Sequence, residues 1–119
     1  MKGSRSVVTG GAGFIGSNLV DHLVRIDHKV IVLDNFVSGK KANLAHHKKK
    51  DVKIIRVDIS KSKNLDKYFK KVDYVFHLAG LAEIIPSIKN PKKYFNTNVL
   101  GTLKVVEAAK RVGVKKLIY

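Results

Sequence analysis

The chain of 119 residues contains no cysteine and no tryptophan, only two prolines and few acidic side chains. Without cysteine it forms neither disulfides nor thiolate–metal sites, so the sequence leaves the redox compartment undetermined. It also has no apolar run of about 18 residues and no basic-then-apolar leader, the features typical of a membrane span and of a secretory signal. We therefore expect a cytoplasmic protein with no membrane partner.

The shortage of acidic residues leaves a large positive charge. Nine Asp and Glu oppose 24 Lys and Arg, for a formal net charge of +15, and much of it falls between Asn35 and Lys71. A basic patch of this kind could bind nucleic acid. The lysines are not interleaved with the aromatic residues on which single strands stack. A lysine-rich, solvated surface is therefore favoured, and nucleic-acid binding is kept as an alternative.

Five short apolar runs are separated mostly by helical patterns. The runs are rich in Val and Ile and lack a clean alternation, as is typical of strands buried on both faces of a parallel sheet. They are SVVTG, KVIVLD, VKIIRVD, DYVFHLA and KKLIY. The pattern predicts one domain over residues 1–119, an α/β Rossmann-type, doubly wound parallel sheet of about five strands in the order 3-2-1-4-5.

Apolar residues at helical spacing predict two longer helices. The first set is Ile15, Leu19, Leu23 and Ile26, and the second is Phe95, Val99, Leu103, Val106 and Ala109. Asn90 and Pro91 suit the start of the second helix, and Gly113 suits its end. We expect shorter helices around residues 43–47 and 62–71.

The stretch VVTGGAGFIGSNLV places four glycines between the first strand and the first helix. Gly10, Gly13 and Gly16 form a G-x-x-G-x-x-G pattern, and Gly11 adds a G-x-G-x-x-G reading. Glycines here permit a tight turn, close approach of the backbone to a pyrophosphate, and close packing of helix on strand. The helix N-terminus then faces the anion. Because strand, turn and helix occur together, the pattern indicates a dinucleotide site.

Asp34 ends the second predicted strand, at the distance from the glycines where an acidic residue binds the adenosine ribose. Its charge would repel a 2′-phosphate, which favours NAD over NADP. Lys40 and Lys41 lie close by in the sequence and could tolerate that phosphate, so this preference is an expectation to be tested.

These motifs together resemble an extended short-chain dehydrogenase/reductase, and more closely the NAD-dependent nucleotide-sugar epimerase/dehydratase family. TGGAGFIGSNLV matches the opening motif of that family, and VLDNFVSGKKANL is similar to the adenosine-binding loop of UDP-glucose 4-epimerases. VDISK, VFHLAGLA and NTNVLGTLKVVEAAKRVGVKKLIY match later blocks in order. The resemblance covers the whole chain.

The resemblance implies a role in NAD binding for residues from each block. The pyrophosphate would contact Gly10, Gly13, Phe14 and Ile15. The adenosine ribose would contact Asp34, Asn35, Ser38 and Gly39, and the adenine would contact Asp58 and Ile59. The nicotinamide-side ribose would lie over Leu78, Ala79 and Gly80. Asn98 resembles a helix asparagine near the cofactor, although it could equally bond only to backbone.

The resemblance also implies what this chain does not carry. The family's proton transfer needs a Tyr-x-x-x-Lys pair, and no tyrosine here has a lysine four residues later. Ala82 stands where many 4-epimerases carry a lysine. No catalytic residue is therefore expected, and the C-terminal catalytic and sugar-binding part is expected to lie in a longer parent. The alternative is a non-catalytic dinucleotide-binding or assembly module.

Two further expectations concern metals and self-association. His46 and His47 stand side by side, but neighbouring histidines on a helix do not readily face one ion and no carboxylate cluster accompanies them in the sequence, so no metal site is expected. Unpaired groups of the last strand, residues 115–119, and apolar residues of the helix 94–112 predict a homo-oligomer.

Overall fold

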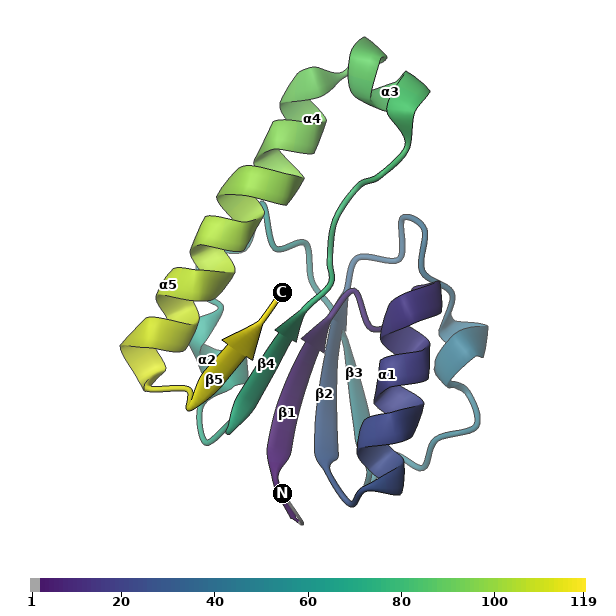
Figure 1. The fold of residues 1–119 in the computed structure, drawn as a ribbon, viewed down its shortest axis with the longest axis vertical. Helices are drawn as coiled ribbons and strands as arrows, with labels where there is room; N and C mark the ends of the chain where they lie inside the picture. Colours follow the sequence, from purple (N-terminus) through teal and green to yellow (C-terminus); the bar gives the residue numbers. More distant parts are fainter. Residues whose placement is uncertain (1–2) are drawn as a thin grey trace.

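A computed structural model describes residues 3–119. Five parallel strands form one sheet in the order β3-β2-β1-β4-β5, so β1 lies at the centre, where the strand order reverses (Figure 1). The strands are β1 (Arg5–Thr9), β2 (Lys29–Asp34), β3 (Val52–Arg56), β4 (Tyr74–His77) and β5 (Lys116–Ile118). The five predicted strands and their order are confirmed.

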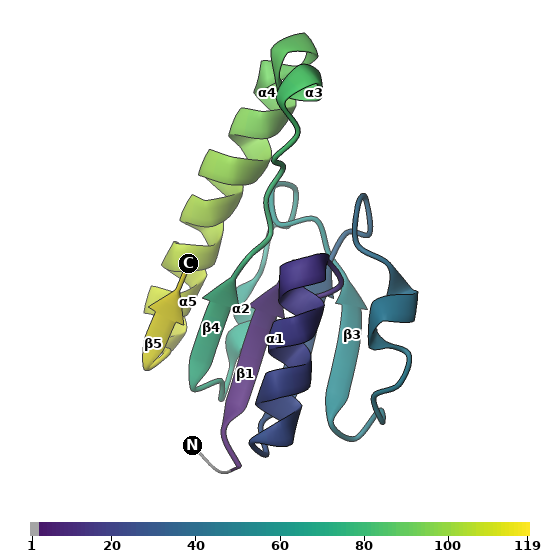
Figure 2. The ribbon, with the colours of Figure 1, turned by 45° about the vertical axis from the view of Figure 1, so that its right-hand side comes forward.

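Helices cover both faces of this sheet (Figure 2). One face packs against α1 (Phe14–Arg25) and the short 3-10 turn η1 (Lys41–Leu44), and the other packs against α2 (Asp66–Phe69) and α5 (Thr102–Val112). Adjacent residues of β1 show why its sequence does not alternate. Val7 packs with the α2–α5 side and Val8 packs with the α1 side, and both are fully buried.

The long helical segment after β4 is interrupted rather than uniform. It comprises α3 (Ile84–Lys89), α4 (Pro91–Phe95), a π-helical segment η2 (Asn96–Gly101) and α5. Asn90 caps α4 as predicted, accepting from the Lys93 backbone N–H, and Gly113 ends α5 in the left-handed conformation with φ of 74°. The short helix α3 is not expected from the sequence. The shorter predicted helices at 43–47 and 62–71 are observed as η1, which ends before His46, and as α2.

The predicted apolar helix faces are only partly the buried faces. In α1, Ile15 is 69% exposed at the amino end, whereas Val20 and Leu23 are buried. In α5 the core is formed by Val105, Ala108 and Ala109, while Leu103 is half exposed. Helical spacing predicts that a helix has an apolar stripe. Where a helix has apolar residues on two sides, the spacing does not tell which side faces the sheet. Across residues 3–119, no helix is both long and apolar enough for a membrane crossing.

Candidate functional site

A cavity of about 400 Å³ opens at the carboxyl ends of β1, β2 and β4, beside the point where the strand order reverses. In doubly wound sheets this crevice is where ligands bind. All of the residues that the resemblance assigns to NAD, except Asn98, line it: Gly10, Gly13, Phe14, Ile15, Asp34, Asn35, Ser38, Gly39, Asp58, Ile59, Leu78, Ala79 and Gly80. Segments far apart in the chain thus share one concave surface.

Two glycines, one in the turn after β1 and one in the first turn of α1, are required by the fold itself. Gly10 has φ of +68°, and a Cβ there would lie 2.7 Å from the backbone nitrogen of Ala79. A Cβ on Gly16 would overlap the Gly10 carbonyl oxygen and come within 2.7 Å of the Gly11 Cα. These positions accept no side chain because helix α1 packs directly against the turn and the turn against the loop after β4.

Gly13 differs from its neighbours. Its φ is −77°, which any residue can adopt, and a Cβ there would meet only the Gly10 carbonyl oxygen, at 3.4 Å. Packing in the free protein therefore does not require a glycine at this position. Gly13 lines the cavity and precedes α1, whose start has no side-chain cap and no acidic residue in its first turn. The N–H groups of that first turn lack intrahelical acceptors, and such groups can donate hydrogen bonds to an anion.

The glycine turn and the loop after β2 are joined at one peptide, that of Ala12. Its N–H donates to Asp34 Oδ2 at 2.9 Å. Its carbonyl oxygen accepts from the Lys40 backbone N–H at 3.0 Å and from Asn43 Nδ2 at 2.9 Å. Ala12 is fully buried, so both of its backbone groups are satisfied by a different segment of the chain.

Asp34 organises this region with both of its carboxylate oxygens. Oδ1 accepts from the Phe36 N–H at 2.8 Å, and Oδ2 accepts from Ala12. The residue is only 7% exposed. A carboxylate has lone pairs for about four hydrogen bonds, so capacity remains for a ligand. Gly39 lies against it, since a Cβ there would come within 2.9 Å of Asp34 Oδ2.

The next wall of the cavity is built around Asp58 and Ile59. Asp58 Oδ1 accepts from the backbone N–H and the hydroxyl of Ser60, at 2.9 and 2.6 Å, which leaves Oδ2 able to accept from a ligand. Burial raises the pKa of Asp58, but the bonds from Ser60 and the charge of Lys61 outweigh burial and lower it overall. Lys104 Nζ of α5 donates to the Ser60 carbonyl oxygen at 2.7 Å and holds this loop in place.

The loop after β4 is supported by a chain of hydrogen bonds through His77. The Thr9 hydroxyl oxygen accepts from the Ala79 N–H at 3.2 Å and shares the Leu78 N–H, so its own hydrogen points to His77 Nδ1, 2.7 Å away. Nδ1 is therefore the acceptor, and Nε2 carries the proton. Nε2 donates to the Thr102 hydroxyl at 2.8 Å, which donates to the Asn98 carbonyl oxygen at 2.7 Å.

Asn98 binds the same loop with its side chain. Its Oδ1 accepts from the Leu81 N–H and its Nδ2 donates to the Leu81 carbonyl oxygen, both at 2.8 Å. In the free protein both ends of the amide therefore bond to the backbone of Leu81. Asn98 supports residues that line the cavity, and its neighbour Thr97 lines it directly.

Several residues that shape the site gave no signal in the sequence. Asn43 and Lys104 act on backbone carbonyl groups of distant loops, and Thr9 reads as an ordinary strand residue. The contacts that give these residues their roles exist only after the loops have come together.

The comparisons with known proteins agree with this geometry. The model of the NAD-dependent epimerase/dehydratase family matches residues 6–119. The chain belongs to this family. One relative, UDP-glucuronic acid decarboxylase 2 of Arabidopsis thaliana, is 44% identical over 118 residues, 98% of this chain and 25% of its own length. The chain therefore spans about a quarter of the length of such curated relatives.

Solved structures similar to this chain include sugar-nucleotide epimerases. UDP-N-acetylglucosamine 4-epimerase from Methanobrevibacter ruminantium M1, in complex with UDP-N-acetylmuramic acid, is 43% identical with a TM-score of 0.92, over 100% of this chain and 38% of that one. UDP-glucose 4-epimerase from Thermus thermophilus, in complex with NAD, is 38% identical with a TM-score of 0.85, over 97% and 36%. The family fold is shared over nearly all of this chain.

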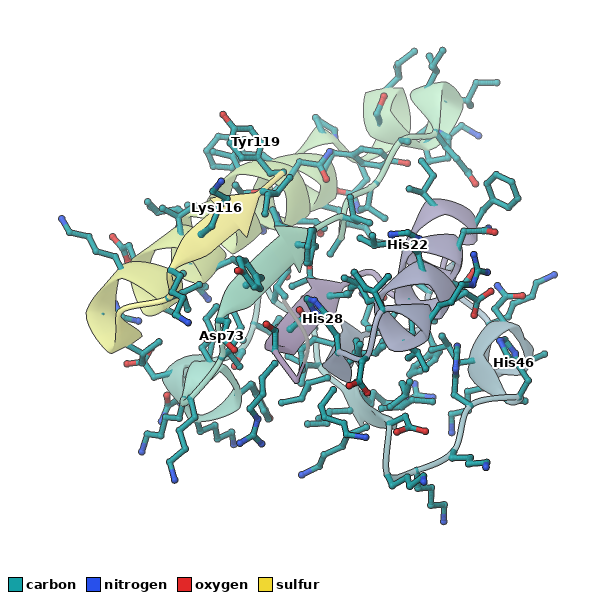
Figure 3. The ribbon with its side chains drawn as sticks, turned by 60° about the horizontal axis from the view of Figure 1, so that its bottom comes forward. His22, His28, His46, Asp73, Lys116 and Tyr119 are labelled. Atoms are coloured by element: carbon teal, nitrogen blue, oxygen red, sulfur yellow. The ribbon has the colours of Figure 1, made fainter. Side chains whose placement is uncertain are left out.

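The neutral His77 makes stability depend on pH. Burial lowers the pKa of His77, and it also lowers that of His28, which lies beside β1 (Figure 3). The unfolded chain takes up protons that the folded chain does not, so stability is fully present above about pH 6.5 and falls as the pH drops below it. Denaturant titrations from pH 7 to pH 5 measure how the free energy of unfolding falls with pH. The slope of that fall should be smaller in His77→Gln than in wild type, by at most about 1.4 kcal/mol per pH unit.

His22, which is exposed on α1, provides the matched control. His22→Gln should change the slope less than His77→Gln does, and part of the slope should remain in His77→Gln because His28 still titrates. An equal slope in wild type and His77→Gln would show that the hydrogen-bond chain tolerates a charged imidazole.

Proposed function

We propose that the cavity binds NAD, and that this chain is the NAD-binding portion of an enzyme acting on nucleotide sugars, most like a UDP-glucose 4-epimerase. The observation that carries the proposal is the uncapped start of α1, which faces a cavity closed at its other side by the buried carboxylate of Asp34. One end of the cavity suits a pyrophosphate and the other suits a ribose diol, and these groups lie next to each other in a dinucleotide.

The proposed arrangement assigns each part of NAD to one wall. The pyrophosphate lies on Gly13 and the first turn of α1, and the adenosine ribose bonds to Asp34. Adenine lies against Ile59, with Asp58 Oδ2 accepting from its exocyclic amine. The nicotinamide-side ribose lies over Ala79 and its neighbours, the loop supported by Thr9 and Asn98.

The sugar-nucleotide part of the proposal rests on the relatives. Their names describe UDP-glucuronic acid decarboxylases and UDP-sugar epimerases, which act on related UDP-sugars. No Tyr-x-x-x-Lys pair occurs in the 119 residues, so NAD here is expected to be held rather than used. The hydride and proton transfers of the family would need residues outside this chain.

Substitutions at Gly13 and Gly16 should have different effects, the first on NAD binding and the second on stability. Gly13→Ala places a methyl group where the backbone approaches the pyrophosphate, so NAD affinity measured by calorimetry should fall at least about tenfold. Its cost to stability should stay below about 1 kcal/mol because the position is a helix N-cap where a Cβ makes only an ordinary contact, 3.4 Å from the Gly10 carbonyl oxygen. Gly16→Ala should instead cost about 1–3 kcal/mol or more through overlap with Gly10.

Thermal unfolding without ligand serves as the control for both variants. If Gly13→Ala folded normally and bound NAD as tightly as the wild type, the pyrophosphate would not lie on this turn and the proposed site would be wrong.

Asp34 should select NAD over NADP. A 2′-phosphate would bring negative charge against a carboxylate that is 7% exposed, so NADP should bind at least about tenfold more weakly than NAD. Asp34→Asn removes the charge and should bring the NADP affinity closer to the NAD affinity. Because Asn cannot accept from both Ala12 and Phe36, the variant should also lose about 1–3 kcal/mol of stability, and the ratio of the two affinities is the informative quantity. Equal affinities for NAD and NADP in the wild type would contradict this role.

We also propose that the chain self-associates through the outer face of the α4–α5 segment, with the β5 edge at 115–119 as a secondary contact. The supporting observation is a stripe of half-exposed apolar side chains at helical spacing: Phe95, Val99, Leu103 and Val106. A second copy offers the same stripe, and two such helices can pair about a two-fold axis. The positive charge opposes pairing, so association should strengthen as salt screens it.

Leu103→Lys places a charge in the centre of that stripe and should shift light-scattering mass toward the monomer. Asn64→Lys adds the same charge at another exposed position and should not. A strict monomer for the wild type at high protein concentration and moderate salt would rule out self-association of this chain.

A further inference from the structure

Three potential metal ligands meet outside the cavity. Asp21 belongs to α1, and His46 and His47 follow η1. Both imidazole Nε2 atoms lie 2.7 Å from the same oxygen, Asp21 Oδ1. The three ligand atoms all lie within 4.8 Å of one another, and none of the three residues lines the cavity.

The reason for expecting no metal here does not apply to the folded chain. Neighbouring residues of a helix project about 100° apart, which would separate two histidine side chains. The 3-10 turn ends at Leu44, however, and His46 and His47 lie in the irregular turn beyond it. Their rings lie 4.1 Å apart between centroids and converge on Asp21, which comes from a different element.

We propose that Asp21, His46 and His47 bind a divalent transition-metal ion of the Zn²⁺ and Ni²⁺ class. Two imidazole nitrogens and one carboxylate oxygen are ligands that these ions favour over the harder Mg²⁺ and Ca²⁺. In tetrahedral zinc sites with ligand bonds of about 2.0–2.2 Å, the ligand atoms lie about 3.3–3.5 Å apart. The two nitrogen–oxygen separations of 2.7 Å are shorter than that spacing, and all three ligand atoms lie within 4.8 Å of one another, so small outward rotations of the side chains admit the ion.

The burial of one ligand distinguishes this cluster from side chains that meet by chance on the surface. The His47 side chain is only 8% exposed and holds one ligand in place, whereas His46 is 58% exposed and can adjust. Burial raises the pKa of Asp21, but the hydrogen bonds from His46 and His47 outweigh burial and lower the pKa overall. Three protein ligands leave one position for water.

The surrounding charge sets a limit on affinity. Lys48, Lys49 and Lys50 follow directly in the sequence and repel a cation. Salt screens charges beyond about 8 Å at physiological ionic strength, whereas the coordinate bonds act at contact. Metal binding would fasten the loop after β2 to α1, and that loop also supplies Lys40 and Asn43 to the Ala12 carbonyl oxygen.

The test is calorimetric titration of the tag-free chain with Zn²⁺ and, separately, Ni²⁺, with no NAD present. One ion per chain is expected. Asp21→Asn, His46→Ala and His47→Ala should each weaken binding by at least about tenfold, the range typical even for loss of residues that only support a ligand. His22→Ala is the matched control, since His22 is exposed on α1 next to Asp21, on the same helix as the proposed ligand (Figure 3).

His46→Ala keeps the test decisive if His47→Ala fails to fold, because His46 is the more exposed of the two histidines. A thermal midpoint that rises with Zn²⁺ in wild type and His22→Ala, but not in Asp21→Asn or His46→Ala, would support the site. No saturable binding, or binding that survives both Asp21→Asn and His46→Ala, would overturn it and leave an Asp–His–His hydrogen-bonded cluster.

Discussion

The hydrogen bond between the buried Asp34 carboxylate and the Ala12 N–H is the constraint on which the rest of the site depends. A charged acceptor with little water nearby makes such a bond worth about 1.5–3 kcal/mol, and leaving either partner unpaired would cost a similar amount. The bond fixes the end of β2 against the turn after β1. With Lys40 and Asn43 holding the carbonyl side of the same peptide, the turn and the loop form one body before any ligand arrives.

Glycines and threonines have different roles in this arrangement: the glycines set how α1 approaches the sheet, and the threonines support the loop after β4. Gly10 and Gly16 let α1 pack against β1, so the helix N-terminus points into the crevice, while Gly13 keeps that crevice open. On the other side of β1, the Thr9–His77–Thr102 bonds fix the loop after β4. A parallel sheet brings the carboxyl ends of β1, β2 and β4 to one edge, and these polar links convert that edge into a rigid concave surface.

The strands, their order, the glycine turn and Asp34 were predicted from local patterns, because buried strands, glycine turns and an acidic strand end leave such patterns. Most of the other predicted residues that line the cavity came from the family resemblance. The sequence did not predict which stripe of a helix is buried: Ile15 and Leu103 fit the helical spacing but are exposed. It also could not decide how Asn98 bonds, nor that His46 and His47 converge on Asp21. Those outcomes depend on the conformation of turns and on partners far away in the chain, which a local pattern does not encode.

Amide hydrogen exchange with and without NAD tests the central claim that the site is assembled before the cofactor binds. We expect the Ala12 amide to be as well protected as the amides of β1 in the free protein, since Asp34 already accepts its hydrogen bond. The Phe14 and Ile15 amides, which lack intrahelical acceptors, should exchange quickly and become protected only when NAD is added. Rapid exchange at Ala12 in the free protein, followed by protection with NAD, would show that the ligand builds the site and would contradict the account.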